Sequence, residues 1–482
     1  MDRVRGGAPG RERAGPPLPD SRMEANPVSV PAPPPWVDDR GAALFTDLYE
    51  LSMLQAYRRE GMDEVPATFS LFVRDLPPGR GYLLACGLDD ALRFLERVRF
   101  GPEALEHLRA TGRFDEEFLA WLRGFRFTGE VRAVPEGTPV FPGEPILEVT
   151  APIAQGQLAE TYVMNQVHLQ TLLASKAARV VRAAAGRAVV DYGARRIHGT
   201  DAALKAARAF HVAGVSATSD VLAGWIYGVP VAGTMAHSFV QAFRSEKEAF
   251  RAFVRSFPDT VLLVDTYDTL EGVRRVVELA RELGDDFRVR GVRLDSGDLA
   301  ELAVGARGIL DAAGLGRVEI VASGGLDEFG IAELLSRGAP IDGFGVGTRM
   351  GVSADAPALD MAYKLTEYAG EGRVKLSTGK RLLPGRKQVF RVEEGGRAVR
   401  DVLAREGEAV DGRPLLRPVM SGGERLPEGV ADLDAARERT RRELEVLPER
   451  VLALRPEGPP YPVEVSPGLR AYDREVSGRA GR

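Results

Sequence analysis

Seven short apolar runs between residues 188 and 348 constrain the fold of this chain more than any other feature. Each run ends in Gly, Ser, Thr or Asp, and most are followed by a stretch with helical periodicity. Nearly continuous apolar character is typical of parallel strands buried on both faces, and repeated strand–helix units indicate an α/β protein. The number of units favours an irregular (β/α) barrel over an open doubly wound sheet. The runs are AVVDYG, AGVSAT, VPVAGT, VLLVDT, GVRLDS, VEIVAS and GFGVGT.

The segments on either side of these units follow different patterns. Upstream, LFTDLYELSMLQAYRREG is amphipathic and predicts a helix that begins near Thr46 or Asp47. Further on, ATFSLFVRDLP alternates like a strand. Downstream of residue 355, AYKLTEYAGEGRVKLSTG and RKQVFRVEEGGRAV read as hairpins. We therefore predict a second, α+β domain formed by the N- and C-terminal segments.

These patterns divide the chain into five expected parts. The first part, residues 1–36, is rich in Pro, Gly and Arg and lacks the apolar core of a secretory signal, so we expect it to be disordered. The parts are a tail over 1–36, an N-terminal α+β domain over 37–155, a barrel-like catalytic domain over 156–354, a β-rich segment over 355–455 that packs on the N-terminal domain, and a loose tail over 456–482.

The overall composition excludes several classes of protein. The 482 residues are 44% hydrophobic and 28% charged, as in ordinary soluble proteins. A net charge of −5 gives no electrostatic case for nucleic-acid binding, and no apolar run approaches the roughly 18 residues that span a membrane. The single cysteine, Cys86, excludes an internal disulfide. We expect a cytoplasmic protein.

Two glycine-containing loops at consecutive strand ends give the clearest chemical signal. SGG at 323–325 and GVGT at 345–348 follow the last two runs. Glycines let backbone N–H groups approach an anion, and the hydroxyls of Ser323 and Thr348 add donors. Phosphate binding by the last loops recurs in (β/α) barrels. The alternative is that the glycines only form tight turns, and the presence of both loops favours phosphate binding.

The polar residues at two other strand ends also suggest a site for an anion. RLDSGD contains Arg293, Asp295 and Asp298. Its two carboxylates could hold Mg²⁺ or ribose hydroxyls, or an aspartate could cap the following helix. After AVVDYG, Arg195 and Arg196 could grip a carboxylate or phosphate. A solvated pair on a helix face is the alternative for the two arginines.

Among five histidines, His237 is the one that follows a strand-like run with small neighbours, in GTMAHSF. Its imidazole is available near neutral pH as a nucleophile, acid or base. A structural histidine is the alternative. Of the others, His198 lies close to the two arginines and is a weaker candidate, whereas the surrounding residues favour structural roles for His107, His168 and His211.

Taken together and in order, these segments resemble the nicotinate phosphoribosyltransferase family over about residues 42–395. The matching stretches are FTDLYELSMLQAY, GARRIHG, ATSDVLAGWIYGVPVAGTMAHSFVQAF, VDTYDT, GVRLDSGDL, ASGGLDE, DGFGVGT and AYKLTEY. The resemblance implies an irregular barrel-like domain plus an α/β domain from both chain ends, in a homodimer whose active sites lie at the subunit interface. It also implies formation of nicotinate mononucleotide and pyrophosphate from nicotinate and phosphoribosyl pyrophosphate, the first step of NAD salvage from nicotinate.

The resemblance further implies ATP hydrolysis coupled through a phosphohistidine at His237, in the ATP-dependent ligase class, with Mg²⁺ required. Asp295 would face ribose or Mg²⁺, and Tyr49 would stack on the pyridine ring from the partner subunit. The remaining residues would bind substrate. Thr234 and Arg293 would lie at the nicotinate or ribose side, Arg195 would hold the carboxylate, and Ser323, Gly324, Gly325, Gly347 and Thr348 would hold the 5′-phosphate.

One departure and three rival functions accompany this resemblance. The family pattern predicts Asn where the chain has Asp220, whose carboxylate would point outward or cap a helix. A nicotinamide phosphoribosyltransferase would carry an acidic residue in the base pocket, where Ser219 stands, so nicotinate is favoured. A non-catalytic sensor of phosphate ligands would not need His237, Asp295 and Arg293 together. A barrel aldolase would need a strand-end lysine.

Overall fold

A curled parallel sheet is the centre of the computed structural model, which describes residues 37–376 and 382–480. Its strand order is β7-β6-β11-β10-β9-β8. Six of the seven apolar runs supply these strands. The strands are β6 (Ala188–Asp191), β7 (Ala217–Thr218), β8 (Val261–Leu263), β9 (Gly291–Leu294), β10 (Glu319–Ala322) and β11 (Gly343–Val346).

The remaining run, VPVAGT, forms only a single parallel bridge between Val231 and Thr218 of β7. Pro230 has no N–H to donate, which limits pairing at this point. The bridge therefore extends one edge of the sheet, while β8 forms the other edge. Within the described residues no pairing joins these two edges. The sheet is a partly open barrel, which confirms the expected irregular barrel-like fold.

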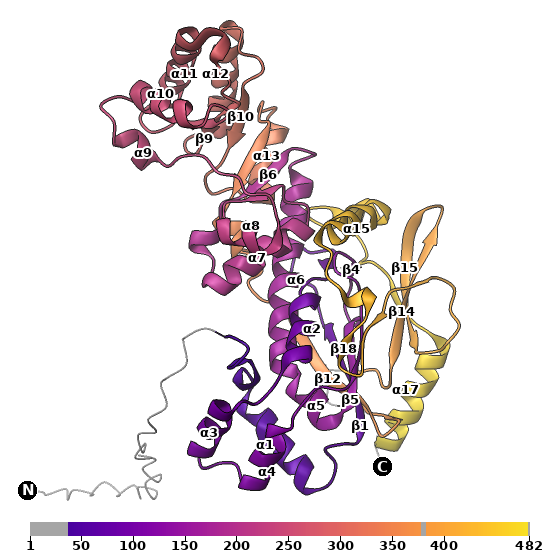
Figure 1. Cartoon of the computed structure of the whole chain (residues 1–482). Coiled ribbons are helices and arrows are strands. Elements are labelled where there is room, and N and C mark those ends of the chain that lie inside the picture. Colours follow the sequence, from indigo (N-terminus) through magenta and orange to yellow (C-terminus); the bar gives the residue numbers. More distant parts are fainter. Residues whose placement is uncertain (1–36, 377–381, 481–482) are drawn as a thin grey trace, which may run out of the picture.

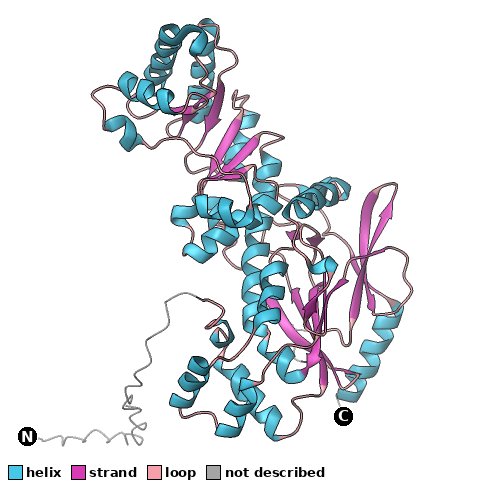
Figure 2. Cartoon of the chain, viewed as in Figure 1, coloured by secondary structure: helices cyan, strands magenta, loops and turns pink. Residues whose placement is uncertain are grey.

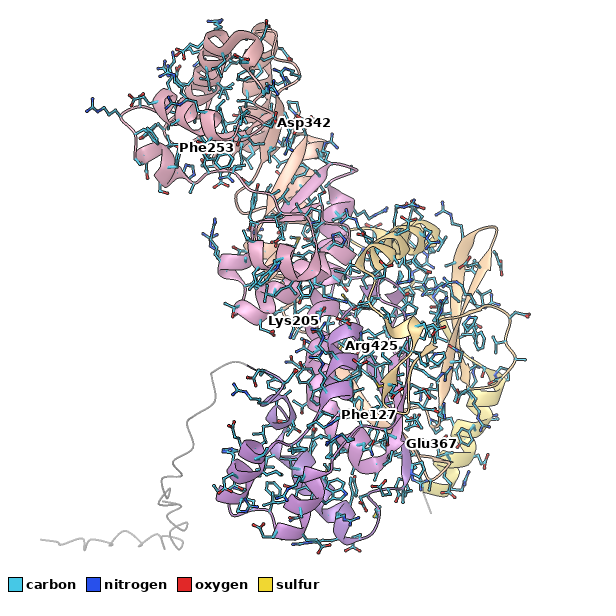
Figure 3. All side chains as sticks on the ribbon, viewed as in Figure 1. Phe127, Lys205, Phe253, Asp342, Glu367 and Arg425 are labelled. Atoms are coloured by element: carbon cyan, nitrogen blue, oxygen red, sulfur yellow. The ribbon has the colours of Figure 1, made fainter. Side chains whose placement is uncertain are left out.

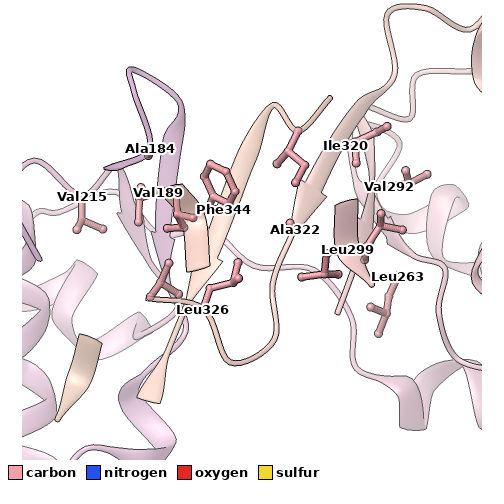
Figure 4. Close-up of a cluster of buried hydrophobic side chains, with 14 of the residues drawn as sticks. Ala184, Val189, Val215, Leu263, Val292, Leu299, Ile320, Ala322, Leu326 and Phe344 are labelled. Atoms are coloured by element: carbon pink, nitrogen blue, oxygen red, sulfur yellow. The ribbon is translucent and has the colours of Figure 1, made fainter. Parts of the chain in front are cut away.

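Helices lie around this sheet (Figure 2). Figure 4 shows side chains from successive strands forming one apolar layer, and Val189, Phe344, Ile320, Val292 and Leu263 are each at most 1% exposed. Each such burial contributes about 1.5–3 kcal/mol. The helices are α7 (Thr200–Val212), α8 (Val221–Tyr227), α9 (His237–Gln241), α10 (Glu246–Ser256), α11 (Thr269–Leu283), α12 (Leu299–Ala312), α13 (Glu328–Ser336) and α14 (Thr348–Gly351).

A second sheet joins the two ends of the chain. Its order is β13-β12-β1-β5-β3-β17-β18, so β1 from the N-terminal segment pairs with β12 from the C-terminal segment. This confirms the expected α+β domain built from both ends. The strands are β1 (Pro66–Val73), β3 (Glu130–Ala133), β5 (Pro145–Pro152), β12 (Met361–Tyr368), β13 (Glu371–Gly372), β17 (Arg417–Ser421) and β18 (Glu424–Arg425).

Smaller elements surround this antiparallel sheet. Figure 3 labels Arg425, at the end of β18, whose guanidinium binds Asp89 and Glu96 of α2 and so ties the two chain ends together. The N-terminal elements are α1 (Leu48–Arg59), α2 (Leu88–Arg97), α3 (Pro102–Ala110), α4 (Glu116–Arg123), β2 (Leu83–Leu84) and β4 (Pro139–Val140). The C-terminal elements are β14 (Lys387–Glu394), β15 (Arg397–Arg405), β16 (Arg413–Pro414), α15 (Leu433–Val446), α16 (Glu449–Leu452), β19 (Val463–Val465) and α17 (Pro467–Ala480).

One long helix connects the two sheets. After the short helix α5 (Ile153–Leu158), α6 (Glu160–Ala183) runs from the antiparallel sheet to the parallel sheet (Figure 1). Val163 and Val167, near its start, belong to the apolar core of the antiparallel sheet. Ala177 and Val180, near its end, belong to the core of the parallel sheet. The two cores are therefore linked by a single rigid element.

The C-terminal segment differs from the expected loose tail over 456–482. Strand β19 pairs in parallel with β15, and α17 buries Leu469 and Val476. The Pro- and Gly-rich stretch before β19 suggested disorder, but it is only the connection to these packed elements. The expected tail over 1–36 lies outside the described residues. No helix in the described part of the chain is long and apolar enough to cross a membrane.

Candidate active site

The loops after β9 and β10 meet at the carboxyl edge of the parallel sheet. Ser323 follows β10 and is 2% exposed. Its hydroxyl donates to Asp295 Oδ1 at 2.5 Å, and its backbone N–H donates to Leu294 O at the end of β9. Parallel strands place their carboxyl ends side by side, so two residues 28 positions apart in sequence share one hydrogen bond.

Gly324 allows this contact because a side chain has no room at its position. A Cβ there would lie 2.0 Å from the carbonyl oxygen of Asp295, and its φ of +95° is one that glycine adopts readily. Gly325 also has a positive φ, +65°, but a Cβ there would meet nothing within 4 Å. The two glycines therefore differ: Gly324 permits loop-to-loop packing, while the space beside Gly325 is open.

The GVGT loop packs against the loop after β6. A Cβ on Gly345 would lie 2.4 Å from the ring of Tyr192, and a Cβ on Gly347 would lie 3.2 Å from the Tyr192 carbonyl oxygen. Arg196 donates from Nη1 to Thr348 Oγ1 at 3.3 Å. Both glycines therefore allow the GVGT loop to pack closely on the loop after β6. Arg196 reaches the GVGT loop from the loop after β6.

A second bridge joins the loops after β10 and β11. Asp327 caps α13 by accepting from the backbone N–H groups of Phe329 and Gly330. Its other oxygen accepts from Arg349 at 2.8 Å. Burial raises the pKa of Asp327, but the Gly330 N–H and the Arg349 guanidinium outweigh burial, so the net pKa is lowered. The carboxylate therefore stays charged and holds the two loops together.

Beneath these loops lies a buried ion-pair cluster. The ammonium of Lys176, on α6, lies 2.5 Å from Glu328 and 2.7 Å from Asp355. Arg179 also binds Glu328, at 3.0 Å. Lys176 and Glu328 side chains are at most 1% exposed. This cluster fixes the first residue of α13, and hence the SGG loop, to the long helix α6.

His237 is the first residue of α9, at the opposite part of the same sheet edge. Its Nδ1 lies 3.2 Å from Thr266 Oγ1, and its Nε2 lies 4.0 Å from Asp265 Oδ1. The side chain is 41% exposed. The small residues before it leave the imidazole accessible to a ligand while one nitrogen faces a carboxylate.

Asp265 is a site residue that the sequence analysis did not single out. Its side chain is fully buried, and Oδ2 accepts from the Asp295 backbone N–H at 3.1 Å and from the Ser296 hydroxyl at 2.6 Å. Oδ1 has no hydrogen-bond partner within the described residues. The carboxylate thus connects His237 to the loop of Asp295. The signal for it was its position at a strand end, in VLLVDT.

Arg293 lies between the two parts of the site. Its Nη2 donates to the carbonyl oxygen of Met235 at 3.1 Å, and its guanidinium lies 5.6 Å from the ring centre of Tyr192. The Nε–H is buried without a partner in the described structure. Thr234, next to Met235, donates its hydroxyl to the Met235 carbonyl at 3.3 Å. The structure therefore brings Arg293 and Thr234 together.

The loop after β6 is organised by a buried carboxylate, Asp191. It accepts from the Gly193 N–H at 2.7 Å and from the Thr218 hydroxyl at 2.8 Å. Burial raises the pKa of Asp191 to about 6, although both hydrogen bonds act in the opposite direction. Arg195 follows in a single helical turn and is exposed. Its guanidinium is therefore free to reach a ligand.

Tyr49 is not close to the other candidate residues within one chain. It lies on α1, which is at the opposite end of the molecule from α9 (Figure 1). Its side chain is 46% exposed, together with its neighbours Phe45 and Leu48. A tyrosine in this place can contribute to the site only from another molecule.

Several other candidates have structural roles. Asp220 caps α8 by accepting from the N–H groups of Leu222 and Ala223, and Asp298 caps α12 while binding Arg337 at 2.9 Å. Among the histidines, His168 accepts from the Leu359 N–H, and His211 binds Asp434 at 3.0 Å.

The described residues contain no cluster of three or more His, Cys, Asp or Glu side chains that could hold a metal ion by themselves. Asp265 and Asp295 nevertheless lie next to each other. Mg²⁺ is commonly held by one or two carboxylates together with substrate phosphates and water, and this pair fits that pattern.

Comparison with known proteins identifies the family. Residues 44–168 match the nicotinate phosphoribosyltransferase N-terminal domain, and residues 187–383 match the nicotinate phosphoribosyltransferase family. The chain is 57% identical over 424 residues to nicotinate phosphoribosyltransferase pncB2 of Mycobacterium tuberculosis, covering 88% of this chain and 91% of that protein. It is 41% identical over 388 residues to nicotinate phosphoribosyltransferase of Bacillus subtilis, covering 79% of each.

A solved structure agrees with these matches. The crystal structure of human nicotinic acid phosphoribosyltransferase superposes with a TM-score of 0.80 at 30% identity, covering 90% of this chain and 99% of that one. The similarity thus extends over both sheets and over the loops that carry the candidate residues. The chain belongs to the nicotinate phosphoribosyltransferase family.

Proposed function

We propose that this protein joins nicotinate to phosphoribosyl pyrophosphate, forming nicotinate mononucleotide and releasing pyrophosphate. The observation that carries the proposal is the braced pair of loops at Ser323–Gly325 and Gly347–Thr348, beside Asp295 and Arg293. Relatives with 57% and 41% identity bear the name of this activity. Both lines of support point to the same carboxyl edge of the parallel sheet.

The 5′-phosphate would bind at the two loops. The glycines would let backbone N–H groups approach the phosphate, and the Thr348 hydroxyl would donate to it. The Ser323 hydroxyl already donates to Asp295, so this residue would hold the loop in place. Arg196, already hydrogen-bonded to Thr348, would add positive charge. Because Asp295 and Arg349 hold these loops before substrate arrives, little reorganisation is required on binding.

The chemical step would take place between the loops and His237. The pyridine nitrogen attacks the ribose anomeric carbon as the bond to pyrophosphate breaks, and positive charge develops on the ribose. The carboxylates of Asp265 and Asp295 would stabilise that charge. Arg293 and Thr234 would position the ring or ribose, and Arg195 would bind the carboxylate of nicotinate. Mg²⁺ would balance the charge of pyrophosphate, held by the carboxylates and the substrate.

ATP coupling through His237 is part of the proposal. An imidazole nitrogen would attack the γ-phosphorus of ATP, the bond to the β-phosphate oxygen would break, and ADP would leave. The accessible ring and the carboxylate of Asp265, 4.0 Å from Nε2, suit this role, because the carboxylate stabilises a ring that carries positive charge. Water then hydrolyses the phosphohistidine. This would place the enzyme in the ATP-dependent ligase class.

A homodimer would complete the site. Tyr49 is exposed at the far end of the chain from His237, so a partner subunit is needed to supply it. Helix α8, beside the site, exposes Val221, Leu222, Trp225 and Ile226, of which Trp225 is 84% exposed. Clustered apolar side chains of this kind mark interfaces. Packing α8 against the Tyr49 region of a second copy would cover both apolar surfaces.

The test is turnover of nicotinate by the purified protein with phosphoribosyl pyrophosphate and Mg²⁺, with and without ATP. We expect wild type to make nicotinate mononucleotide and to be stimulated by ATP. In His237→Ala the ATP-independent turnover should remain while stimulation is lost. His198→Ala is the matched control, because His198 is also an exposed histidine, it lies in the loop after β6, and no ion pair joins it to Asp265 in the described part of the chain.

Each other outcome would change the assignment. ATP stimulation that survives in His237→Ala would remove the phosphohistidine but leave the transferase. A preference for nicotinamide would move the protein to the nicotinamide-specific reaction, although Ser219 carries no acid that would favour an amide. Absence of turnover with either base would favour a sensor that binds phosphate ligands without catalysis.

A further inference from the structure

A cavity of about 310 Å³ lies between α15 and the strands of the C-terminal segment. None of the candidate active-site residues lines it. Its volume is at the lower end of the range for small-molecule sites. Six of its lining side chains are charged: Arg413, Arg417, Arg439, Arg442, Glu393 and Glu443.

One face of α15 forms a wall of this cavity. Arg439, Arg442, Glu443 and Val446 are spaced by three, four and seven residues, so they share one side of the helix. Strands β14, β16 and β17 supply the facing charged residues. The wall is therefore built from regular elements rather than from a loose surface loop.

The two glutamates of the cavity form their ion pairs with arginines other than Arg417, Arg439 and Arg442. Glu443 Oε2 accepts from the fully buried Arg391 at 3.0 Å, and Glu443 Oε1 lies 2.7 Å from Arg413. Glu393 lies 3.4 Å from the same Arg413. Four arginines thus face two glutamates in the lining, so its net charge is positive.

Three arginines of the cavity are consequently short of negative charge. Across residues 37–376 and 382–480, neither Arg417 nor Arg439 forms an ion pair; Arg439 donates only to the carbonyl oxygen of Glu136, at 2.6 Å. Arg442 is 3.6 Å from Glu438, which also binds Arg441. Burial, and then the charge of Arg417, lower the pKa of Arg439; Arg442 acts in the same direction, and the opposing charges of Glu443 and Glu136 do not cancel these effects. Like charges held together in this way favour a bound anion.

Apart from Thr138, the rest of the lining is apolar. Pro135, Pro414, Leu415 and Val446 line the same cavity, and Leu415 is buried. A cavity of this size exceeds what a bare phosphate ion would fill. We propose that it binds a phosphate ester of a small ring-containing molecule, of the mononucleotide class. Arg417, Arg439 and Arg442 hold the phosphate, and the apolar residues contact the ring.

The proposal is tested by calorimetric titration of AMP and of inorganic phosphate into the full-length protein. We expect Arg417→Gln/Arg442→Gln to weaken AMP binding at one site by about 100-fold, since charge-assisted hydrogen bonds to phosphate are lost. Arg441→Gln is the matched control, because Arg441 is on the same helix, similarly exposed and outside this cavity. Its AMP affinity should stay within about twofold of wild type.

A binding isotherm of the double variant that matches wild type would overturn the proposal, because any AMP bound at the active site does not depend on these arginines. Inorganic phosphate binding as tightly as AMP would overturn the assignment of an ester with a ring. The thermal midpoint of the double variant serves as the folding control. Both substituted side chains are exposed, so this midpoint should be unchanged.

Discussion

The two halves of the carboxyl edge of the parallel sheet are built differently. In the half formed by β9, β10, β11 and β6, side chains bridge every neighbouring pair of loops: Ser323 to Asp295, Arg349 to Asp327, and Arg196 to Thr348. In the half between Val231 and β8, the sheet edges are unjoined within the described residues, and His237 contacts only Thr266 and the more distant Asp265.

This difference separates two tasks. The braced half fixes hydrogen-bond donors before a ligand arrives, which is what tight binding of a phosphate requires. The open half leaves a reactive side chain and an apolar helix, α8, exposed, and under the proposed function ATP and a second subunit would cover them. Substitutions in the braced half should therefore affect stability most, and substitutions in the open half should affect assembly and coupling.

The largest expected effect comes from Glu328→Gln, which removes the charge that binds Lys176 beneath the braced half. The buried Lys176 would keep only Asp355 as a partner and Arg179 would lose its carboxylate, which should cost about 3–5 kcal/mol in the free energy of unfolding. Urea denaturation measures it. The control is Glu438→Gln, which breaks an exposed pair with Arg441 and should cost at most about 1 kcal/mol. Equal losses in the two variants would show that the buried cluster does not brace the loops.

Gly324→Ala should have the next largest effect. The new Cβ would lie 2.0 Å from the Asp295 carbonyl oxygen at a φ of +95°, so the two loops must separate. We expect a loss of about 3 kcal/mol in stability and a raised KM for phosphoribosyl pyrophosphate. Gly325→Ala meets no atom within 4 Å and should cost about 1–2 kcal/mol from its positive φ alone. Similar KM values for both variants would contradict the packing argument.

The sequence predicted the braced half better than the open half. Six of the seven apolar runs became strands of the parallel sheet, because buried parallel strands carry a strong local signal. The run VPVAGT did not, since a single proline limits pairing in a short strand. The fold class and the loops of Ser323 and Thr348 could thus be found from local patterns alone.

Contacts between distant residues could not be found in this way. Asp265 and His237 are 28 positions apart, and their approach depends on where β8 lies relative to α9. Lys176 and Glu328 are separated by most of the barrel, and their charges gave no sign of burial. The packed segment over 463–480 was missed because its strand β19 is short and follows a Pro- and Gly-rich stretch.

Asp191 lies at the junction between the two halves, because it binds Gly193 on one side and Thr218 on the other. The pH dependence of stability tests its contribution there. Its pKa is about 6 in the folded protein instead of 3.8. The folded state thus keeps a proton that the unfolded state has lost. Protonated Asp191 therefore adds roughly 2–3 kcal/mol to the unfolding free energy below about pH 4, and this contribution should be lost as the pH rises towards 6.

Asp191→Asn is the matched variant for this prediction, because an amide can keep both hydrogen bonds and does not titrate. Urea denaturation of wild type and variant from pH 4 to pH 7 gives the difference in unfolding free energy. The unfolding free energy of the variant should rise relative to that of wild type as the pH increases from 4 to about 6. Above that pH the difference between the two should stay constant. A constant difference across the range would mean that Asp191 is ionised throughout.

Trp225→Glu tests whether α8 in the open half is covered by a second copy. The side chain is 84% exposed in one chain, so the fold of the subunit should be unaffected. If it packs in a dimer interface, burying a charge there should weaken association by about 2 kcal/mol or more. Sedimentation velocity measures the dimer fraction. An unchanged dimer would place the interface elsewhere, and an unchanged thermal midpoint at monomer concentrations is the control.

The smallest effect is expected for Asp220→Asn in the same helix. The carboxylate caps α8 through Leu222 and Ala223, and Asn caps nearly as well as Asp, so only a few tenths of a kcal/mol should be lost as the negative charge at the helix N-terminus disappears. Asp220→Ala should cost about 1 kcal/mol. Because the cap turns the carboxylate into the helix, the KM for phosphoribosyl pyrophosphate should stay within about twofold in Asp220→Asn. A KM that falls severalfold would show that the carboxylate faces the anionic substrate. The Asp220 charge in the open half would then repel the substrate in wild type unless a positive group neutralised it.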